Sequence, residues 1–81
     1  MTDVEFYRRL GRRLRIIRRE LGMSEDQAAE AFGVRVETYR GYELGRRPKN
    51  PLPFVRFVSD HGINGDWLIL GKLPRLREAK Q

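Results

Sequence analysis

The segment from Ser24 to Gly45 constrains the fold more than any other part of this 81-residue chain. It holds two short stretches of helix-forming sequence, separated by the dipeptide Gly33-Val34. Glycine tolerates the positive φ at which helices often end, so the first stretch is predicted to end at Gly33. Before it, Ala29 has a side chain small enough to let two helices cross closely. The sequence therefore predicts two helices joined by a tight turn.

Apolar and aromatic residues then recur where they would bury this pair of helices against a scaffold. They are Ala28, Phe32, Val34, Tyr39 and Tyr42. A pair buried in this way leaves the outer face of its second helix, predicted near residues 35 to 43, free to enter a DNA major groove. The segment thus has the order of a helix-turn-helix.

A long helix is predicted before this motif. Apolar residues recur at steps of three and four, at Tyr7, Leu10, Leu14, Ile17 and Leu21. The helix should begin at a capping box, Thr2-Asp3-Val4-Glu5, and end at Gly22. A second capping box, Ser24-Glu25-Asp26-Gln27, opens the motif itself.

Two further helices are predicted after the motif. Asn50 is expected to cap a fourth helix with Pro51 at its first position, and Gly62 to end it. A short fifth helix is expected from Asp66 to Leu70. The expected organisation is therefore one all-α domain of five helices over residues 1–71, followed by a flexible C-terminal tail over residues 72–81.

The composition favours a phosphate-bearing partner and offers no sign of an enzyme. The formal net charge is +6, and arginine, whose planar fork matches phosphate oxygens, outnumbers lysine. There is no cysteine, no nucleophile–base pair and no glycine-rich phosphate loop, and His61 has no histidine or cysteine beside it. We therefore expect no catalytic site, no metal and no cofactor. Without a signal peptide or an apolar run of about 20 residues, a cytoplasmic protein that does not enter membranes is expected.

Over roughly residues 10 to 71, the chain resembles the Cro/cI-type (XRE-like) helix-turn-helix family of phage repressors and bacterial regulators. The resemblance is carried by Leu10-Gly11-Arg12-Arg13-Leu14-Arg15 with Arg18, Gly22-Met23-Ser24, Ala29, Gly33-Val34, Glu43 with Gly45, and Asp66-Trp67-Leu68 before Gly71. It implies a five-helix, lambda-repressor-like DNA-binding domain. It also implies a structural ion pair between Arg18 and Glu43, although Arg18 could instead be one more solvated arginine of a basic helix.

The resemblance further implies which residues read bases, namely Arg35, Val36, Glu37 and Gly41. Arg35 could donate to guanine O6 and N7, Val36, exposed by the pattern, could meet a thymine methyl, and Glu37 could accept from a cytosine amino group. Gly41 would read nothing or allow close backbone approach. Val36 and Glu37 could instead be ordinary surface residues, because relatives often carry glutamine, asparagine, serine or lysine at these places.

Phosphate contacts are expected from the start of the motif and from the loop after it. The residues are Ser24, Arg40, Arg46, Arg47 and Lys49. Ser24 caps a helix whose unpaired N–H groups can receive a phosphate. Glu25 stands where many relatives have a phosphate-binding glutamine, so a contact there would be repulsive.

The expected partner is double-stranded DNA, bound by a homodimer that could assemble only on the DNA. Ile69 and Leu70 are the candidate dimer interface, beside a Trp67 and Leu68 that complete the core. The leading hypothesis is a sequence-specific transcriptional regulator, a repressor occupying a palindromic operator. Activation is a variant, because Glu25, Asp26 and Glu30 could contact RNA polymerase. The alternatives are a protein-interaction module whose helix-turn-helix no longer reads DNA, and nonspecific binding by charge alone.

Overall fold

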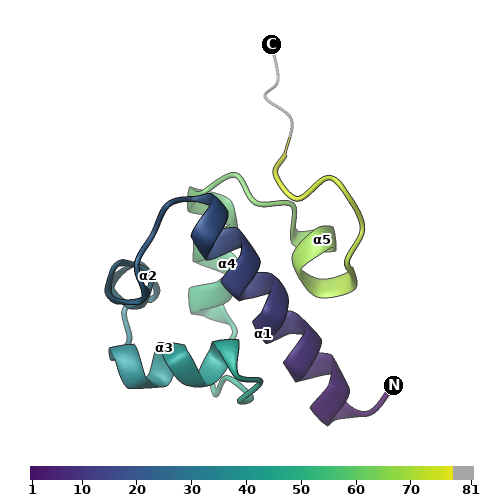
Figure 1. Cartoon of the computed structure of the whole chain (residues 1–81), viewed down its shortest axis with the longest axis horizontal. Coiled ribbons are helices and arrows are strands. Elements are labelled where there is room, and N and C mark those ends of the chain that lie inside the picture. The colour runs from purple at the N-terminus through teal and green to yellow at the C-terminus, as the bar shows by residue number, and fades with distance from the viewer. Residues whose placement is uncertain (78–81) are drawn as a thin grey trace.

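The computed structural model describes residues 1–77, which form five helices and no β-strand longer than a single bridge (Figure 1). The helices are α1 (Asp3–Glu20), α2 (Glu25–Phe32), α3 (Val36–Glu43), α4 (Leu52–Asp60) and α5 (Gly65–Leu70). This confirms the predicted all-α, five-helix domain. In Figure 1, α2 is seen end-on while α3 lies across the view, so these two helices are strongly inclined to each other.

The helix ends follow the capping signals of the sequence. The Thr2 hydroxyl accepts from the Glu5 backbone N–H at 3.2 Å, which starts α1. Ser24 and Gln27 form the expected reciprocal capping box at the start of α2. Gly33 ends α2 with φ of 72°, in the left-handed region that glycine adopts without steric cost.

Two helices begin slightly later than expected. Arg35 is the N-cap of α3 rather than its first residue, and its side chain makes no capping hydrogen bond. Helix α4 begins at Leu52, with Pro51 as its N-cap. The Asn50 side chain still contributes, because its Oδ1 accepts from the Leu52 N–H at 3.1 Å.

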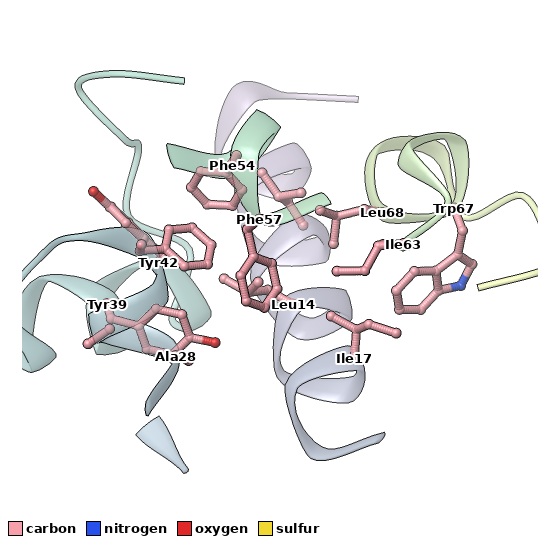
Figure 2. Packing of buried hydrophobic residues seen from close by; sticks show 13 residues of the cluster. Leu14, Ile17, Ala28, Tyr39, Tyr42, Phe54, Phe57, Ile63, Trp67 and Leu68 are labelled. Carbon is pink, nitrogen blue, oxygen red and sulfur yellow. The ribbon is translucent and has the colours of Figure 1, made fainter. Parts of the chain in front are cut away.

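The core lies where all five helices meet, and it includes a cluster of aromatic side chains (Figure 2). The ring of Phe32, which is 1% exposed, packs against Tyr39, Tyr42, Phe54 and Phe57 at centroid distances of 4.7 to 6.0 Å. Each fully buried ring of this kind contributes about 1.5–3 kcal/mol by leaving water. This cluster joins α2, α3 and α4 into one unit.

Helix α3 lies directly against the backbone of α1. A Cβ atom on Gly11 would lie 2.5 Å from the carbonyl oxygens of both Tyr42 and Glu43, far inside van der Waals contact. Only glycine therefore fits at this crossing. The close approach sets the depth at which the C-terminal half of α3 packs on the first helix.

The segment after α5 packs on the domain, which differs from the flexible tail expected from residue 72. The chain turns back, so that the Asn64 N–H donates to the Arg75 carbonyl at 2.8 Å. The Arg77 N–H donates to the Gly62 carbonyl at 2.7 Å. Residues 62 to 64 link α4 to α5. The carbonyl of Gly62 and the N–H of Asn64 find their hydrogen-bond partners in the returning segment, and not in either helix.

A side-chain contact also holds this segment. Arg75 forms an ion pair with Glu20 at the end of α1, with 2.8 Å between Nε and Oε2. The Arg75 guanidinium raises the stability of the ionised carboxylate and so lowers the pKa of Glu20. The remainder of the predicted tail, residues 78–81, lies outside the described residues.

Candidate nucleic-acid interface

The turn between α2 and α3 has the geometry that a helix-turn-helix requires. The N–H of Val34 donates to the Ala29 carbonyl at 3.1 Å, and the N–H of Gly33 donates to the Glu30 carbonyl at 3.0 Å. Ala28 and Ala29 are almost fully buried, at 0% and 3% exposed. Small side chains at these positions allow α3 to cross α2 closely.

Helix α3 has an inner and an outer face. Tyr39 and Tyr42 point into the core and are 0% and 9% exposed. At 100° per residue, Glu37 and Gly41 lie on the opposite side of the helix. Arg35, at the N-cap, and Glu37 are both exposed. The two charged residues expected to read bases are therefore available to a ligand that approaches the outer face.

Val36 is not on the exposed surface that the pattern suggested. It is half-buried and packs against the core cluster. The reason is its position three residues before Tyr39, on the same side of the helix. Its methyl groups are thus only partly available to a base.

Gly41 is on the outer face but is covered by a side chain from the following loop. The N–H of Arg46 donates to the Gly41 carbonyl at 2.8 Å, which folds the loop back on the helix. A Cβ atom on Gly41 would lie 3.3 Å from Arg46 Cδ and 3.4 Å from Arg46 Nε. Arg46 therefore lies over the backbone of Gly41, a position expected either to read no base or to allow close approach of the backbone to DNA.

Arg18 and Glu43 form an ion pair between α1 and the end of α3. Nε of Arg18 is 2.6 Å from Glu43 Oε2, and Nη2 is 3.3 Å from Oε1. The side chains are only 10% and 7% exposed. Arg18 Nη1 also donates to the Met23 carbonyl at 3.0 Å, which ties in the turn before α2. The hydrogen bond to Glu43 raises the pKa of Arg18, against the effect of burial.

The Tyr39 hydroxyl lies in the same buried region. It has no hydrogen-bond partner among the described residues. Burial, and then the nearby Glu43 carboxylate, raise the pKa of this phenol well above its usual range. Its ring fills the core while its hydroxyl contributes no hydrogen bond to the helix-turn-helix.

Exposed cations flank α3 at its C-terminal end. Arg46, Arg47 and Lys49, in the loop before α4, are all exposed. The guanidinium carbon of Arg47 lies 5.9 Å from the centre of the Tyr7 ring, within cation–π range, so this part of the loop leans on α1. The loop thus places positive charge beside the recognition surface, where a phosphate backbone would lie.

At the N-terminal end of the motif, fewer groups are free to bind a DNA phosphate than the sequence suggested. Arg40 is ion-paired with Glu25 at 3.3 Å, and the two side chains remain 54% and 38% exposed. The Ser24 hydroxyl accepts the Gln27 N–H at 3.1 Å, so its role as a helix cap occupies an oxygen lone pair. A phosphate at this end would have to compete with Glu25 for Arg40.

Sequence reasoning missed the role of Arg13, which fixes α5 to α1. Its Nε and Nη2 donate to the carbonyls of Leu68 and Ile69 at 2.7 and 2.8 Å. Helix C-termini leave such carbonyls unpaired, and a cation suits the helix dipole there. Arg13 lies in a conspicuous basic stretch, but nothing local identifies a partner 55 residues away. The contact positions the candidate dimer residues, Ile69 and Leu70, which are 40% and 61% exposed.

The described part of the chain offers neither a membrane-spanning helix nor a metal-binding cluster. None of the helices in residues 1–77 has the length and apolar character to cross a membrane. In this described part of the chain, no three histidine, cysteine or acidic side chains group closely enough to hold a metal ion.

A comparison with protein families agrees with this geometry. Neither the curated proteins nor the solved structures gave a match to the chain. A family model described as a helix-turn-helix domain matches residues 9–57, a range that begins inside α1 and includes most of α4. The match covers more than half of the 81 residues and includes the whole motif. The chain therefore belongs to the helix-turn-helix domain family, a family of DNA-binding domains.

Proposed function

We propose that this protein is a sequence-specific regulator of transcription that binds double-stranded DNA with α3 in the major groove. The supporting observation is the way α3 is held. Its inner face is fixed by Tyr39, Tyr42 and the Glu43 ion pair, while its outer face is exposed beside a cationic loop. A helix fixed on one side and free on the other is the arrangement that groove reading needs.

Arg35 and Glu37 are the proposed base-reading residues at the start of α3. A guanidinium can donate in parallel to guanine O6 and N7, and a carboxylate can accept from a cytosine amino group. Both side chains are exposed and form no ion pair among residues 1–77. Val36 has a smaller role, because the core takes part of its surface.

We assign the contacts with the DNA phosphate backbone to Arg47 and Lys49. Arg40 would join them by leaving its ion pair with Glu25 and binding a phosphate instead. That exchange is favourable in principle, because an exposed ion pair is worth at most about 1 kcal/mol. Ser24 lies at the N-terminus of α2, where backbone N–H groups can meet a phosphate. These contacts would set the register of α3 on the duplex without selecting a sequence.

We further propose that the regulator acts as a dimer on a palindromic operator, as a repressor that blocks access of polymerase. Ile69 and Leu70 are exposed apolar residues on a short helix that Arg13 holds rigidly. Ile69 also lines an apolar groove with Leu10 and Phe54. Two copies joined near this end would read half-sites about one helical turn apart. Asp26 and Glu30 are exposed, as the alternative of activation through contact with RNA polymerase requires.

Selection of bound duplexes from a random pool tests this proposal. A specific reader enriches one sequence, and a dimer enriches a palindrome. With about six phosphates neutralised, the affinity should fall about a thousandfold between 50 and 200 mM salt. Arg35→Ala should lower the preference for the enriched site more than it lowers binding to unrelated duplexes.

Three results would count against the proposal in different ways. Failure to bind any duplex at low salt would indicate a protein-interaction module. Binding without enrichment, with Arg35→Ala weakening all duplexes equally, would indicate binding by charge alone. An enriched site without symmetry would retain the DNA reading but remove the dimer.

A further inference from the structure

Gly41 leaves a notch in the outer face of α3, and the side chain of Arg46 occupies it. Three Arg46 atoms (Cβ, Cδ and Nε) lie 3.3 to 3.5 Å from where a Gly41 Cβ would be. The Arg46 side chain therefore runs across the outer face of α3 rather than away from it. Gly41 is buried for this reason, although it lies opposite the core-facing tyrosines.

We propose that Arg46, although it belongs to the loop, serves as a base-reading residue of the recognition surface and binds guanine in the major groove. This inference rests on the proposed DNA-binding function and assigns to Arg46 a role that position 41 would otherwise have. Gly41 lies one turn after Glu37, on the same face. A side chain lying over Gly41 therefore continues the row that begins with Arg35 and Glu37.

The geometry supports a base contact for Arg46 in preference to a phosphate contact. An arginine that only contacts DNA phosphates could extend freely from the loop, away from the outer face of α3. Here the backbone hydrogen bond from Arg46 to Gly41 fixes where the Arg46 side chain begins, and that side chain lies in the space that a side chain larger than alanine at position 41 would fill. Because this limits the freedom of the side chain, less entropy is lost when it binds.

The Arg46 guanidinium is also free to bind. Five other arginines donate to protein acceptors from their side chains: Arg13, Arg18, Arg40, Arg75 and Arg77. Arg46 makes no side-chain hydrogen bond or ion pair within residues 1–77. A free, planar fork with parallel donors matches O6 and N7 of guanine, the commonest specific contact of the major groove.

The test measures base preference on the site enriched by the wild-type protein, using duplexes substituted at one base pair at a time. Arg46→Ala should abolish the preference for guanine at one base pair of the half-site, a loss of about tenfold or more in discrimination. Arg46→Lys should keep most of the affinity but lose this preference, because it keeps the charge without the fork. Preferences at other base pairs should remain.

Gly41→Leu and Arg47→Ala are the companion variants. The atoms nearest to a Cβ at position 41 belong to the flexible Arg46 side chain, so the larger side chain of Gly41→Leu should displace Arg46 without unfolding the protein, and the preference should be lost at the same base pair as in Arg46→Ala. Arg47→Ala removes a neighbouring loop cation and should weaken every duplex by the same factor. Circular dichroism checks that each variant is folded.

The proposal is overturned if Arg46→Ala weakens all duplexes equally, as Arg47→Ala does, or if Gly41→Leu leaves the wild-type preference intact. Both results are compatible with a wild-type protein that selects a sequence, so they would remove the role of Arg46 alone. A wild-type protein that enriches no sequence would instead remove the proposed function, and this inference with it.

Discussion

The ion pair between Arg18 and Glu43 should contribute strongly to stability, and Glu43→Leu tests this directly. In the wild-type protein, two nitrogens of the guanidinium meet two carboxylate oxygens at 2.6 and 3.3 Å. The Arg18 side chain is only 10% exposed, so water cannot replace the lost carboxylate. In the variant the charge would keep one acceptor, the Met23 carbonyl.

The expected cost follows from leaving this charge uncompensated. Removing one partner of a buried ion pair typically costs about 3–5 kcal/mol. A domain of 81 residues has a total stability of roughly 4–12 kcal/mol at about 0.05–0.15 kcal/mol per residue. Glu43→Leu should therefore remove a quarter or more of the stability and shift the unfolding midpoint markedly.

A double-mutant cycle separates the pair from its surroundings. Arg18→Met should be about as costly as Glu43→Leu, because it leaves a carboxylate buried without a partner. The double variant should cost less than the two single variants together, with a coupling energy of about 2 kcal/mol or more, since no charge remains buried. Urea unfolding followed by far-UV circular dichroism gives each free energy.

The exposed pair of Arg40 and Glu25 is the matched control within the same chain. Its two side chains are 54% and 38% exposed, and its atoms are 3.3 Å apart. Glu25→Gln should change the free energy of unfolding by less than about 1 kcal/mol. A Glu43→Leu variant that cost no more than this control, or a cycle in which the effects of the two substitutions simply added, would show that the buried pair contributes no special stability.

Four further substitutions test other contacts. Gly11→Ala should destabilise the protein by about 3 kcal/mol, because its methyl group meets carbonyl oxygens of α3 at 2.5 Å. In urea unfolding, Gly33→Ala should cost less, roughly 1–2 kcal/mol for its positive φ, and the reverse order would contradict the crossing geometry. Tyr39→Phe should stabilise the protein by about 1 kcal/mol, because it removes a buried hydroxyl without a partner. The pKa of Tyr39 is raised in the folded state, so above about pH 10 the phenol ionises in the unfolded chain while it stays protonated in the folded one. The free energy of unfolding of the wild-type protein should therefore lose about 1.4 kcal/mol per pH unit from this group above that pH, a loss that Tyr39→Phe should not show. Arg13→Met should speed hydrogen exchange in α5, because two carbonyls lose their donor, and unchanged exchange would show that α5 does not depend on it.

The helices could be predicted from sequence because their determinants are local. The box formed by Ser24 and Gln27, and the glycine at 33, act within a few residues of the helix ends that they define. The long apolar stripe of α1 is likewise readable from its spacing, and the structure buries Leu10, Leu14 and Ile17. The starts of α3 and α4 each lie one residue later than predicted, because the N-cap residues Arg35 and Pro51 make no side-chain capping hydrogen bond.

Contacts between distant parts of the chain were harder to predict. The return of Arg75 and Arg77 onto the turn after α4 depends on backbone groups left unpaired there, and composition alone resembled a tail. The exposure of Val36 was misjudged because the first turn of α3 faces the core more than an isolated helix would suggest. In both cases the tertiary surroundings decided the outcome, not the local pattern.

Gly41 shows why a recognition surface cannot be derived from helix register alone. Register correctly puts this residue one turn after Glu37, but it also suggests that a glycine there contributes nothing to recognition. The loop hydrogen bond to the Gly41 carbonyl brings the Arg46 side chain over that position. The missing side chain and the loop arginine are thus parts of a single feature, and substituting either should alter the same contact. A helix-turn-helix with glycine at this position should therefore be examined together with the loop that follows it, because that loop can supply the side chain which the helix lacks.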